Sequence, residues 1–379
     1  MSERAQRKRD RVAMRTFEKL RANPSSYRSA PSTWGAAVFS ACVLLGAAAA
    51  VAALAWATIR ADGAVEWFLV ALGWAVVLVV RPRRHRLPDD VRVLRRADHP
   101  GIWELVDEMA RAVGVEPPDV VAVDLAFNAY VTPIGWGRRD ALVLGLPLMS
   151  LGTWHERAGT IGHELGHLRG RDTLRLRLVA AADRILNGAE YLVAPDAGFE
   201  DRWARGSMAD ESSGNGFFDD LARWVQALLA LPFQGLSRVL DRLDLASSQH
   251  LEYLADRRSA EVVGSEALAQ ALLRDLEGIR TATAAAARRD QDPFAALLAR
   301  PALSSAQQEE HLRLLEAESA RADDTHPLDH LRVKLVRAAA LLPSPVMPVE
   351  ATCRRAESEL VELREVHRKA FADELVYDL

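Results

Sequence analysis

The chain opens with a polar stretch that gives way abruptly to an apolar one. Residues 1–33 are rich in Lys and Arg and indicate a basic, irregular arm. Gly35 to Ile59 then runs for 25 residues without a charge. Because about 20 apolar residues span a bilayer, this run predicts a transmembrane helix at about 35–59. It begins too far along the chain for the apolar core of a cleaved signal peptide.

A second apolar run, at about 64–80, contains Glu66 as its one charged residue and is close to the minimum length of a span. The two runs together predict a transmembrane hairpin over 34–81. Basic residues precede the first run and directly follow the second, and the cytoplasmic flanks of membrane spans are the basic ones. We therefore expect both ends of the hairpin, and everything after it, in the cytoplasm. Should the second run not cross, the remainder of the chain would lie outside.

Residues 82–342 have the patterns of a globular domain. Apolar positions at helical spacing predict a helix from Ile102 to Val113, and Gly114 is suited to end it. The short apolar runs at 117–125 and 141–146 predict strands of a small sheet. Further helical patterns lie at 174–193, 221–240 and 247–261, a loop rich in Gly, Ser and Asp is expected at about 196–220, and a proline-rich break opens a C-terminal helical extension at 343–379. Charges in the first two of these helices argue against full spans. Residues 224–233 are apolar enough to lie on the membrane face, and burial in the protein is the interpretation that we prefer.

One helix is predicted in more detail than the others. Thr153 and Glu156 have the spacing of a capping box at its start. An apolar stripe follows at helical spacing, and two histidines project from nearly the opposite side. Glycines lie between these faces and cost helix propensity unless another element approaches closely. The stripe is Trp154, Ala158, Ile161, Leu165 and Leu168, and the glycines are Gly159, Gly162, Gly166 and Gly170.

His163, Glu164 and His167 form an HExxH pattern on this helix. Side chains four residues apart stand one above the other, so the two imidazoles point at a single spot. This is half of a tetrahedral zinc site, in which one position stays open for water. Glu164 is then placed to take a proton from that water, as in metalloproteases. The bare pattern also recurs by chance on helices whose histidines are simply solvated or buried.

A third ligand has to come from elsewhere in the chain. The metzincin pattern would need a histidine where Thr173 stands, so that class is excluded. Glu252 and Asp256 lie four apart on a predicted helix. This spacing lets Glu252 bind zinc while Asp256 holds the far nitrogen of a ligand histidine. His250 is a competing donor on another side of the same helix.

The chain resembles metallopeptidase family 48, the group of the HtpX-like and CAAX prenyl proteases, from about residue 98 to 340. Four segments carry the resemblance: the triplet NAY at 128–130, HELGH at 163–167, EYLAD at 252–256 and THPLDHLR at 325–332. The proline that the family has after its late HP motif is replaced by Leu328, and the segments that would correspond to further membrane helices are charged.

The resemblance implies an α+β, mainly helical fold: a zincin-type (gluzincin) metalloprotease domain with a small β-sheet, preceded here by the transmembrane hairpin. It implies one zinc ion per chain. Its implied site consists of His163, His167 and Glu252 as metal ligands, Glu164 and His326 as catalytic residues, Asp256 behind a ligand histidine, Asn128, Ala129 and Tyr130 as contacts to an extended peptide, and Arg332 as a further motif residue. His326 is equally well interpreted as a structural residue before Pro327.

Composition narrows the possible functions. A net charge of −4 argues against a nucleic-acid partner, and 379 residues suggest two or three units. The two cysteines form no CxxC motif and fit a reducing compartment. The sequence therefore predicts an integral protein of a bacterial-type plasma membrane whose cytoplasmic domain hydrolyses polypeptides. A zinc-binding scaffold without activity and a prenyl-protein processing protease are the alternatives, and the sequence does not predict an oligomeric state.

Overall fold

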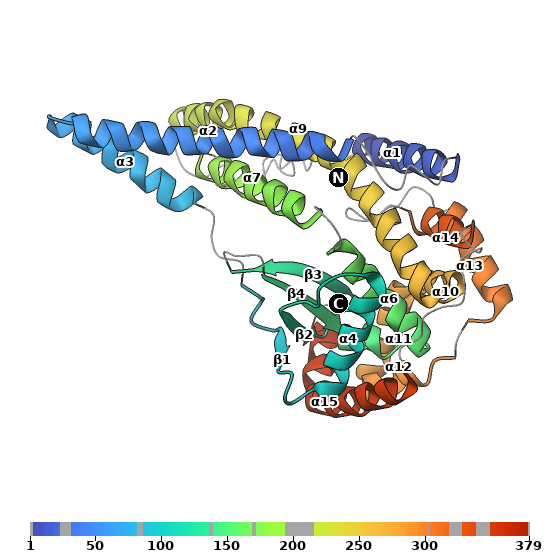
Figure 1. The fold of residues 1–379 in the computed structure, drawn as a ribbon. Helices are drawn as coiled ribbons and strands as arrows, with labels where there is room; N and C mark the ends of the chain where they lie inside the picture. The colour runs from blue at the N-terminus through green and yellow to red at the C-terminus, as the bar shows by residue number, and fades with distance from the viewer. Residues whose placement is uncertain are drawn as a thin grey trace. The chain divides into compact units, whose positions relative to one another are not determined.

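The computed structural model describes residues 3–22, 32–81, 86–135, 139–168, 172–193, 216–301, 303–317, 328–338 and 349–377. The chain divides into two compact units, whose elements are labelled in Figure 1. The sheet unit comprises residues 1–30, 84–173 and 248–379, and the helical unit comprises residues 31–83 and 174–247.

A small mixed sheet lies in the sheet unit. Its strands are β1 (Arg92–Leu94), β2 (Val120–Asp124), β3 (Ala129–Ile134) and β4 (Arg139–Gly145), in the order β1-β2-β4-β3. β2 and β4 are parallel, whereas β3 pairs antiparallel with β4 and ends the sheet on one side. The strands predicted at 117–125 and 141–146 are confirmed. β1 was not predicted, because three residues are too few to show an alternating pattern.

Helices of this unit build the main core together with the sheet. They are α4 (Pro100–Val113), α5 (Leu146–Met149), α6 (Trp154–His167), the end of α9 (Gly216–Val263), α10 (Ser265–Leu272), α11 (Leu276–Ala287), α12 (Pro293–Leu298), α13 (Ser305–Ala317), α14 (Asp329–Ala338) and α15 (Glu350–Tyr377). The predicted helix α4 is confirmed, and Gly114 ends it in the left-handed conformation with φ 78°. α15, from the predicted C-terminal extension, packs on α4, where Glu359 accepts hydrogen bonds from the amides of Gly101 and Ile102.

The N-terminal arm is helical, contrary to the sequence interpretation. Glu3–Ala22 forms α1, which belongs to the sheet unit. Ala13, Phe17 and Leu20 are buried, and their spacing of four and three residues places them on one face of the helix. The many basic residues between them made the segment look polar overall, so the narrow apolar face was not recognised in the sequence. Burial of that face explains why the arm is ordered despite its charge.

The helical unit begins with the two apolar runs. α2 (Ser32–Arg60) and α3 (Ala64–Val80) pack against each other, and the indole of Trp74 donates a hydrogen bond of 3.0 Å to the hydroxyl of Thr58. Among the described residues, α2 is the one helix of sufficient length and hydropathy to cross a membrane, and only 11% of its most apolar window is buried. α3 is apolar but shorter. The two helices are thus confirmed, while crossing of the membrane by α3 stays a prediction.

α7 (Asp172–Val193) and the first part of α9 complete the helical unit. A cluster of buried residues joins three helices of this unit: Ala36 of α2, Ala182 and Leu186 of α7, and Leu240 of α9. The segments 221–240 and 247–261, predicted as separate helices, are one continuous helix, because Ser247 and Ser248 do not interrupt the helical backbone. The expected burial of the apolar residues in this part of α9 holds only in part. Ala230 and Leu240 are buried, whereas four large side chains are exposed, as the alternative of a membrane-facing surface requires: Trp224, Leu228, Leu229 and Leu231.

Two predicted features fall outside the described residues. The loop expected at about 196–220 lies there up to residue 215, and Gly216 to Asp220 already belong to α9. His326 lies there as well.

Candidate metal centre

The helix that carries the two histidines begins as predicted. The hydroxyl of Thr153 accepts a hydrogen bond from the amide of Glu156, and the Glu156 carboxylate accepts one from the amide of Thr153. Both bonds of a capping box are therefore present. Glu156 also pairs with Arg274 from the segment before α11. α6 ends at His167, and Gly170 lies outside the described residues.

The glycines of α6 lie where α9 crosses it, as predicted. A Cβ atom on Gly166 would lie 3.1 Å from the Cα atom of Ala255, and one on Gly162 would lie 3.1 Å from the hydroxyl of Ser259. The Ser259 hydroxyl donates a hydrogen bond of 2.6 Å to the carbonyl oxygen of Gly159. Small residues at these positions thus let the two backbones approach, and this approach brings Glu252 of α9 to the histidines.

Replacing Gly166 by valine is expected to destabilise the protein by about 1–3 kcal/mol, the usual cost of overpacking a core. The new side chain would meet the backbone of α9 at Ala255, and a backbone cannot move aside as a flexible side chain can. Thermal unfolding of the purified chain measures the effect. Gly235→Val is the matched control, because a Cβ atom at Gly235 would meet nothing within 4 Å. Equal unfolding temperatures for the two variants would contradict this helix contact.

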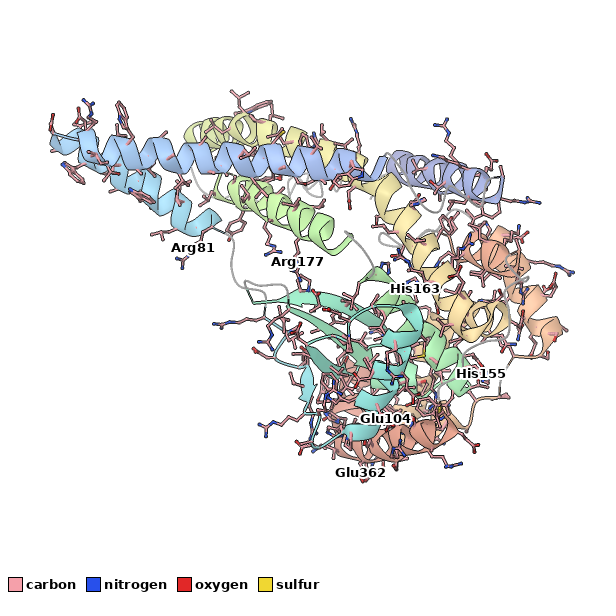
Figure 2. The ribbon with its side chains drawn as sticks, in the orientation of Figure 1. Arg81, Glu104, His155, His163, Arg177 and Glu362 are labelled. Carbon is pink, nitrogen blue, oxygen red and sulfur yellow. The ribbon has the colours of Figure 1, made fainter. Side chains whose placement is uncertain are left out.

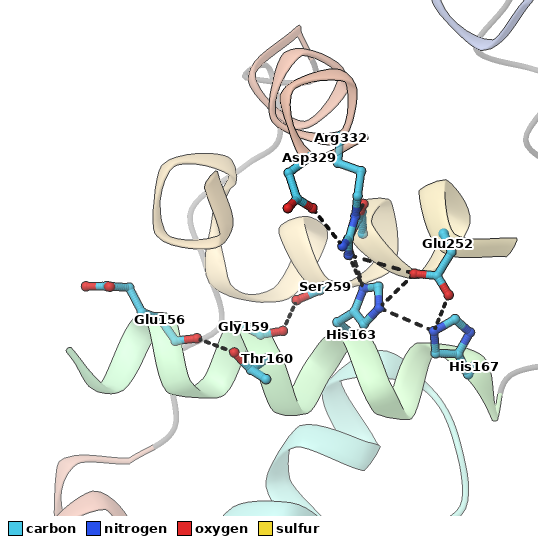
Figure 3. A network of polar contacts seen from close by, with 10 residues as sticks. Glu156, Gly159, Thr160, His163, His167, Glu252, Ser259, Asp329 and Arg332 are labelled. Carbon is cyan, nitrogen blue, oxygen red and sulfur yellow. Dashed lines mark hydrogen bonds and ion pairs between the residues drawn. The ribbon is translucent and has the colours of Figure 1, made fainter. Parts of the chain in front are cut away.

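Three donor groups converge at the end of α6 (Figure 3). The Nε2 atoms of His163 and His167 are 3.3 Å apart. The two carboxylate oxygens of Glu252 lie 3.4 Å from these atoms, one oxygen facing each imidazole. Two ligands of a tetrahedral zinc ion, each about 2.05 Å from the metal, lie roughly 3.3 Å from each other. One donor atom of each group lies within 4.8 Å of the other two, so the three groups could hold one metal ion.

A buried pair of charges lies behind His163. The Nδ1 atom of His163 is 2.8 Å from the carboxylate of Asp256. Arg332 from α14 holds that carboxylate with two hydrogen bonds of 2.8 Å, from Nε and from a terminal nitrogen. The same terminal nitrogen lies 3.8 Å from Glu252. With one ring nitrogen directed at Asp256, the other is directed at Glu252 and His167, so the contact fixes which nitrogen of His163 is available to a metal.

The electrostatic field at this point is negative. Burial by itself lowers the pKa of His163, but the carboxylates of Asp256 and Glu252 outweigh burial and raise the pKa above its usual range. Burial by itself raises the pKa of Asp256, but Arg332 and His163 lower this pKa by more. The net shift is downward, and the carboxylate is ionised. A field that favours a proton on His163 favours a metal cation at the same place.

The charges of the site fit a divalent cation. Glu164, Glu252 and Asp256 are buried carboxylates, and Arg332 is a buried cation. With both imidazoles neutral, as metal binding requires, three negative charges and one positive charge leave a net charge of −2. Buried charges are costly unless they are compensated, and a doubly charged metal ion would balance this set. Two imidazoles and a carboxylate are also donors that zinc accepts.

Two further predicted residues, Glu164 and His250, differ in their relation to the metal donors. Glu164 is buried and adjacent to His163 on α6. His250 is buried but does not belong to the group of possible metal donors in the described part of the chain, which consists of His163, His167 and Glu252. The competing donor that the sequence left open is therefore not brought to the centre.

The predicted peptide contacts lie on the edge strand. Ala129 and Tyr130 open β3, and the exposed Asn128 precedes them, with its carbonyl oxygen 2.9 Å from the amide of Gly145. The hydroxyl of Tyr130 is hydrogen-bonded to Asp124, and burial raises the pKa of both groups. β3 pairs with β4 on one side and also packs against α6. Its other side is the end of the sheet among the described strands.

Sequence reasoning missed the place of Arg332, which it named only as part of a motif. The structure puts its guanidinium group on Asp256 and next to Glu252. The position of a positive charge in a late helix was not informative by itself. The signal that could have identified Arg332 as part of the site is the predicted burial of Glu252 and Asp256. One imidazole and one metal ion cannot pair with all oxygens of two buried carboxylates, so a buried cation is needed as well.

Two histidines one helical turn apart and a glutamate from a crossing helix form a group that could hold a metal ion. The chain belongs to peptidase family M48, whose family model matches residues 97–340. Membership of a metallopeptidase family implies a metal cofactor, and the group of His163, His167 and Glu252 is compatible with one.

Curated relatives of the chain are proteases by name. A "Protease HtpX homolog" of Pyrococcus abyssi is 31% identical over 195 residues, which cover 50% of this chain and 61% of the relative. "Protease HtpX" of Acinetobacter baylyi is 29% identical, with coverage of 46% and 54%. A "Protease HtpX homolog" of Streptococcus gordonii is 28% identical over 69% of this chain and 82% of the relative. The chain thus spans little more than half the length of the first two relatives. No solved structure shows a significant match.

Proposed function

We propose that the chain is a membrane-anchored, zinc-dependent endopeptidase similar to HtpX, acting on misfolded or membrane proteins. One observation carries this proposal: two imidazole nitrogens 3.3 Å apart, each 3.4 Å from an oxygen of Glu252, beside a buried second glutamate. A protein that only stores or binds zinc has no need of Glu164 at this place. The family and the named relatives support a protease.

In this proposal His163, His167 and Glu252 hold one zinc ion. When bound, zinc supplies a water whose pKa is lowered toward about 7 and polarises the carbonyl group of the substrate. Glu164 takes the proton of the attacking water and delivers it to the leaving amine. Asp256 keeps the imidazole of His163 oriented, and Arg332 keeps Asp256 ionised and in place.

The substrate would bind as an extended peptide along β3. A strand at the end of a sheet has main-chain donors and acceptors that can pair with a further strand. Asn128 lies at the start of this strand, and its exposed side chain would contact the peptide near the site. Because the side chain of Tyr130 is engaged with Asp124, the strand would recognise backbone more than side chains. This favours a broad range of unfolded substrates.

His326 would complete the site as a donor to the oxyanion that develops on the substrate carbonyl. It lies outside the described residues, so this role rests on the late HP motif alone.

The membrane part of the proposal rests on α2 and α3. α2 is long, apolar and mostly exposed, and α3 packs against it. The basic residues that flank the two helices favour a hairpin whose ends both face the cytoplasm. Exposed apolar residues of α9, such as Trp224 and Leu228, are suited to contact lipid as well. The proteolytic site would then act from the cytoplasmic side on polypeptides near the membrane.

Removal of the metal tests the proposal. Detergent-solubilised full-length protein is expected to cleave casein, to lose this activity completely when it is dialysed against a zinc chelator, and to recover it on addition of zinc. Magnesium at the same concentration is the control, because imidazole ligands do not favour it. Zinc-independent cleavage, or stoichiometric zinc without any cleavage, would reject the endopeptidase. A farnesylated CAAX peptide in parallel separates the prenyl-protein processing alternative.

A further inference from the structure

α1 packs on the two helices that hold the far side of the metal centre. Its buried residues Ala13, Phe17 and Leu20 form one cluster with Tyr253 of α9 and with Leu328, Leu331 and Leu335, at or just before α14. α1, this end of α9 and α14 belong to the same compact unit. α1 lies outside residues 97–340, the part that matches the family. The cluster therefore joins a helix outside the matched range to α9 and α14, which lie within it.

The residues of this cluster are direct neighbours of the site residues in sequence. Tyr253 follows Glu252, and Leu331 precedes Arg332. Consecutive residues of a helix point about 100° apart. α9 thus directs Glu252 at the histidines of α6 and Tyr253 at α1, while α14 directs Arg332 at Asp256 and Leu331 at α1. Tyr253 and Leu331 are nearly completely buried.

This arrangement makes α1 a support for the rotation of α9. A carboxylate roughly 6 Å from a helix axis moves by about 1 Å when the helix rotates by about 10°. Metal ligands have to be placed within about 0.2 Å of their proper distances. α6 contacts α9 on one side through the glycines, and α1 contacts it through Tyr253 on another. Without α1, Tyr253 would keep only the leucines at α14 as its partners in this cluster.

We infer that α1 is a positioning element of the metal centre, which fixes the ligand Glu252 and the supporting Arg332 through Tyr253 and Leu331. This inference rests on the proposed function, since it assumes that Glu252 binds the metal. Phe17 is the central contact, being the one aromatic residue that α1 contributes to the cluster. The outward side of the helix, with Met14 and Arg15, is exposed and takes no part.

Phe17→Ala is expected to weaken zinc binding by about ten-fold, the lower end of the effect of residues that support metal ligands. The measurement is the zinc content of full-length protein equilibrated with chelator-buffered zinc, in a Glu164→Gln background that keeps the readout independent of catalysis. Phe17→Leu should restore most of the affinity, because it refills the apolar space. In chains that retain Glu164, saturating zinc should return casein cleavage by Phe17→Ala toward the unmodified level.

Two variants serve as matched controls. Met14→Ala changes the exposed face of the same helix and should leave zinc affinity unchanged. Phe294→Ala removes a buried phenyl ring from α12. α12 packs on α11 and α15, and the ring of Phe294 lies 4.6 Å from the ring of Phe371 in α15. Neither α11 nor α15 carries a site residue. In Figure 2, Glu362 of α15 lies well away from His163.

The outcomes separate this inference from the proposed function. Unchanged zinc affinity in Phe17→Ala would overturn the inference, and so would an equal loss in Phe294→Ala, which would mean a general effect of stability. If the unmodified chain itself binds no zinc, the proposed function fails first. Far-ultraviolet circular dichroism of each variant shows whether it is folded. If Phe17→Ala is not folded, the zinc affinity of Phe17→Leu provides the test instead.

Discussion

Glu164→Gln is expected to abolish casein cleavage while the chain keeps its zinc. Glutamine has the shape of glutamate but accepts no proton at neutral pH, and general acid–base catalysis contributes about 10²- to 10⁴-fold. The loss of kcat should therefore be at least about 100-fold. Glu164 is buried beside His163 but does not belong to the group of metal donors. Zinc content per chain, measured on the same preparation as the activity, should stay at the level of the unmodified protein.

The two measurements together distinguish an enzyme from a scaffold. Cleavage at an unchanged rate by Glu164→Gln would mean that another group accepts the proton or that a contaminating protease is responsible. A loss of zinc along with activity would assign Glu164 to the metal and not to the proton transfer.

Glu252→Ala is expected to lower zinc affinity by more than about 100-fold, because residues that only support ligands already contribute about 10- to 100-fold. The substitution removes the one carboxylate that faces both imidazoles, at 3.4 Å from each. It also leaves Arg332 with Asp256 as its remaining buried acidic partner within 4 Å in the described chain. Zinc retention in chelator-buffered solution measures the change, and casein cleavage should fall in parallel.

Glu261→Ala is the matched control on the same helix. Glu261 pairs with Arg257 at 3.0 Å, and its side chain is 40% exposed, so an effect on zinc is not expected. Full zinc binding by Glu252→Ala would show that the third ligand comes from another residue. The assignment of Glu252 and the support that we infer from α1 would then both be withdrawn.

The candidate site was predictable where its chemistry is local. His163 and His167 lie on one helix, and four-residue spacing alone brings their imidazoles together. Glu252 and Asp256 were predictable as a pair, because the same spacing on a second helix lets one contact the metal and the other the back of a histidine. The glycines of α6 indicated the crossing helix, and the crossing at Ala255 and Ser259 agrees with it.

Contacts between distant segments were not predictable from spacing. Arg332 reaches Asp256 across 76 positions of the chain, and no periodicity in either helix indicates this. The fold of α1 was obscured for a different reason: its basic residues set the composition, whereas three apolar side chains decide its structure. For Trp224 and its apolar neighbours in α9, burial within the protein was preferred to a membrane-facing position because burial is the usual state of such residues, yet these side chains are exposed.

The packing of α1 limits how the polypeptide can be threaded through a bilayer. α1 and the metal centre are parts of one folded unit, and such a unit lies entirely on one side of a membrane. The chain leaves this unit after α1 and rejoins it at residue 84. Between these points an even number of crossings would keep both parts of the unit on one side, which favours the proposed hairpin over a single passage by α2. If α2 crosses, α3 is the helix available for the return, despite its 17 residues.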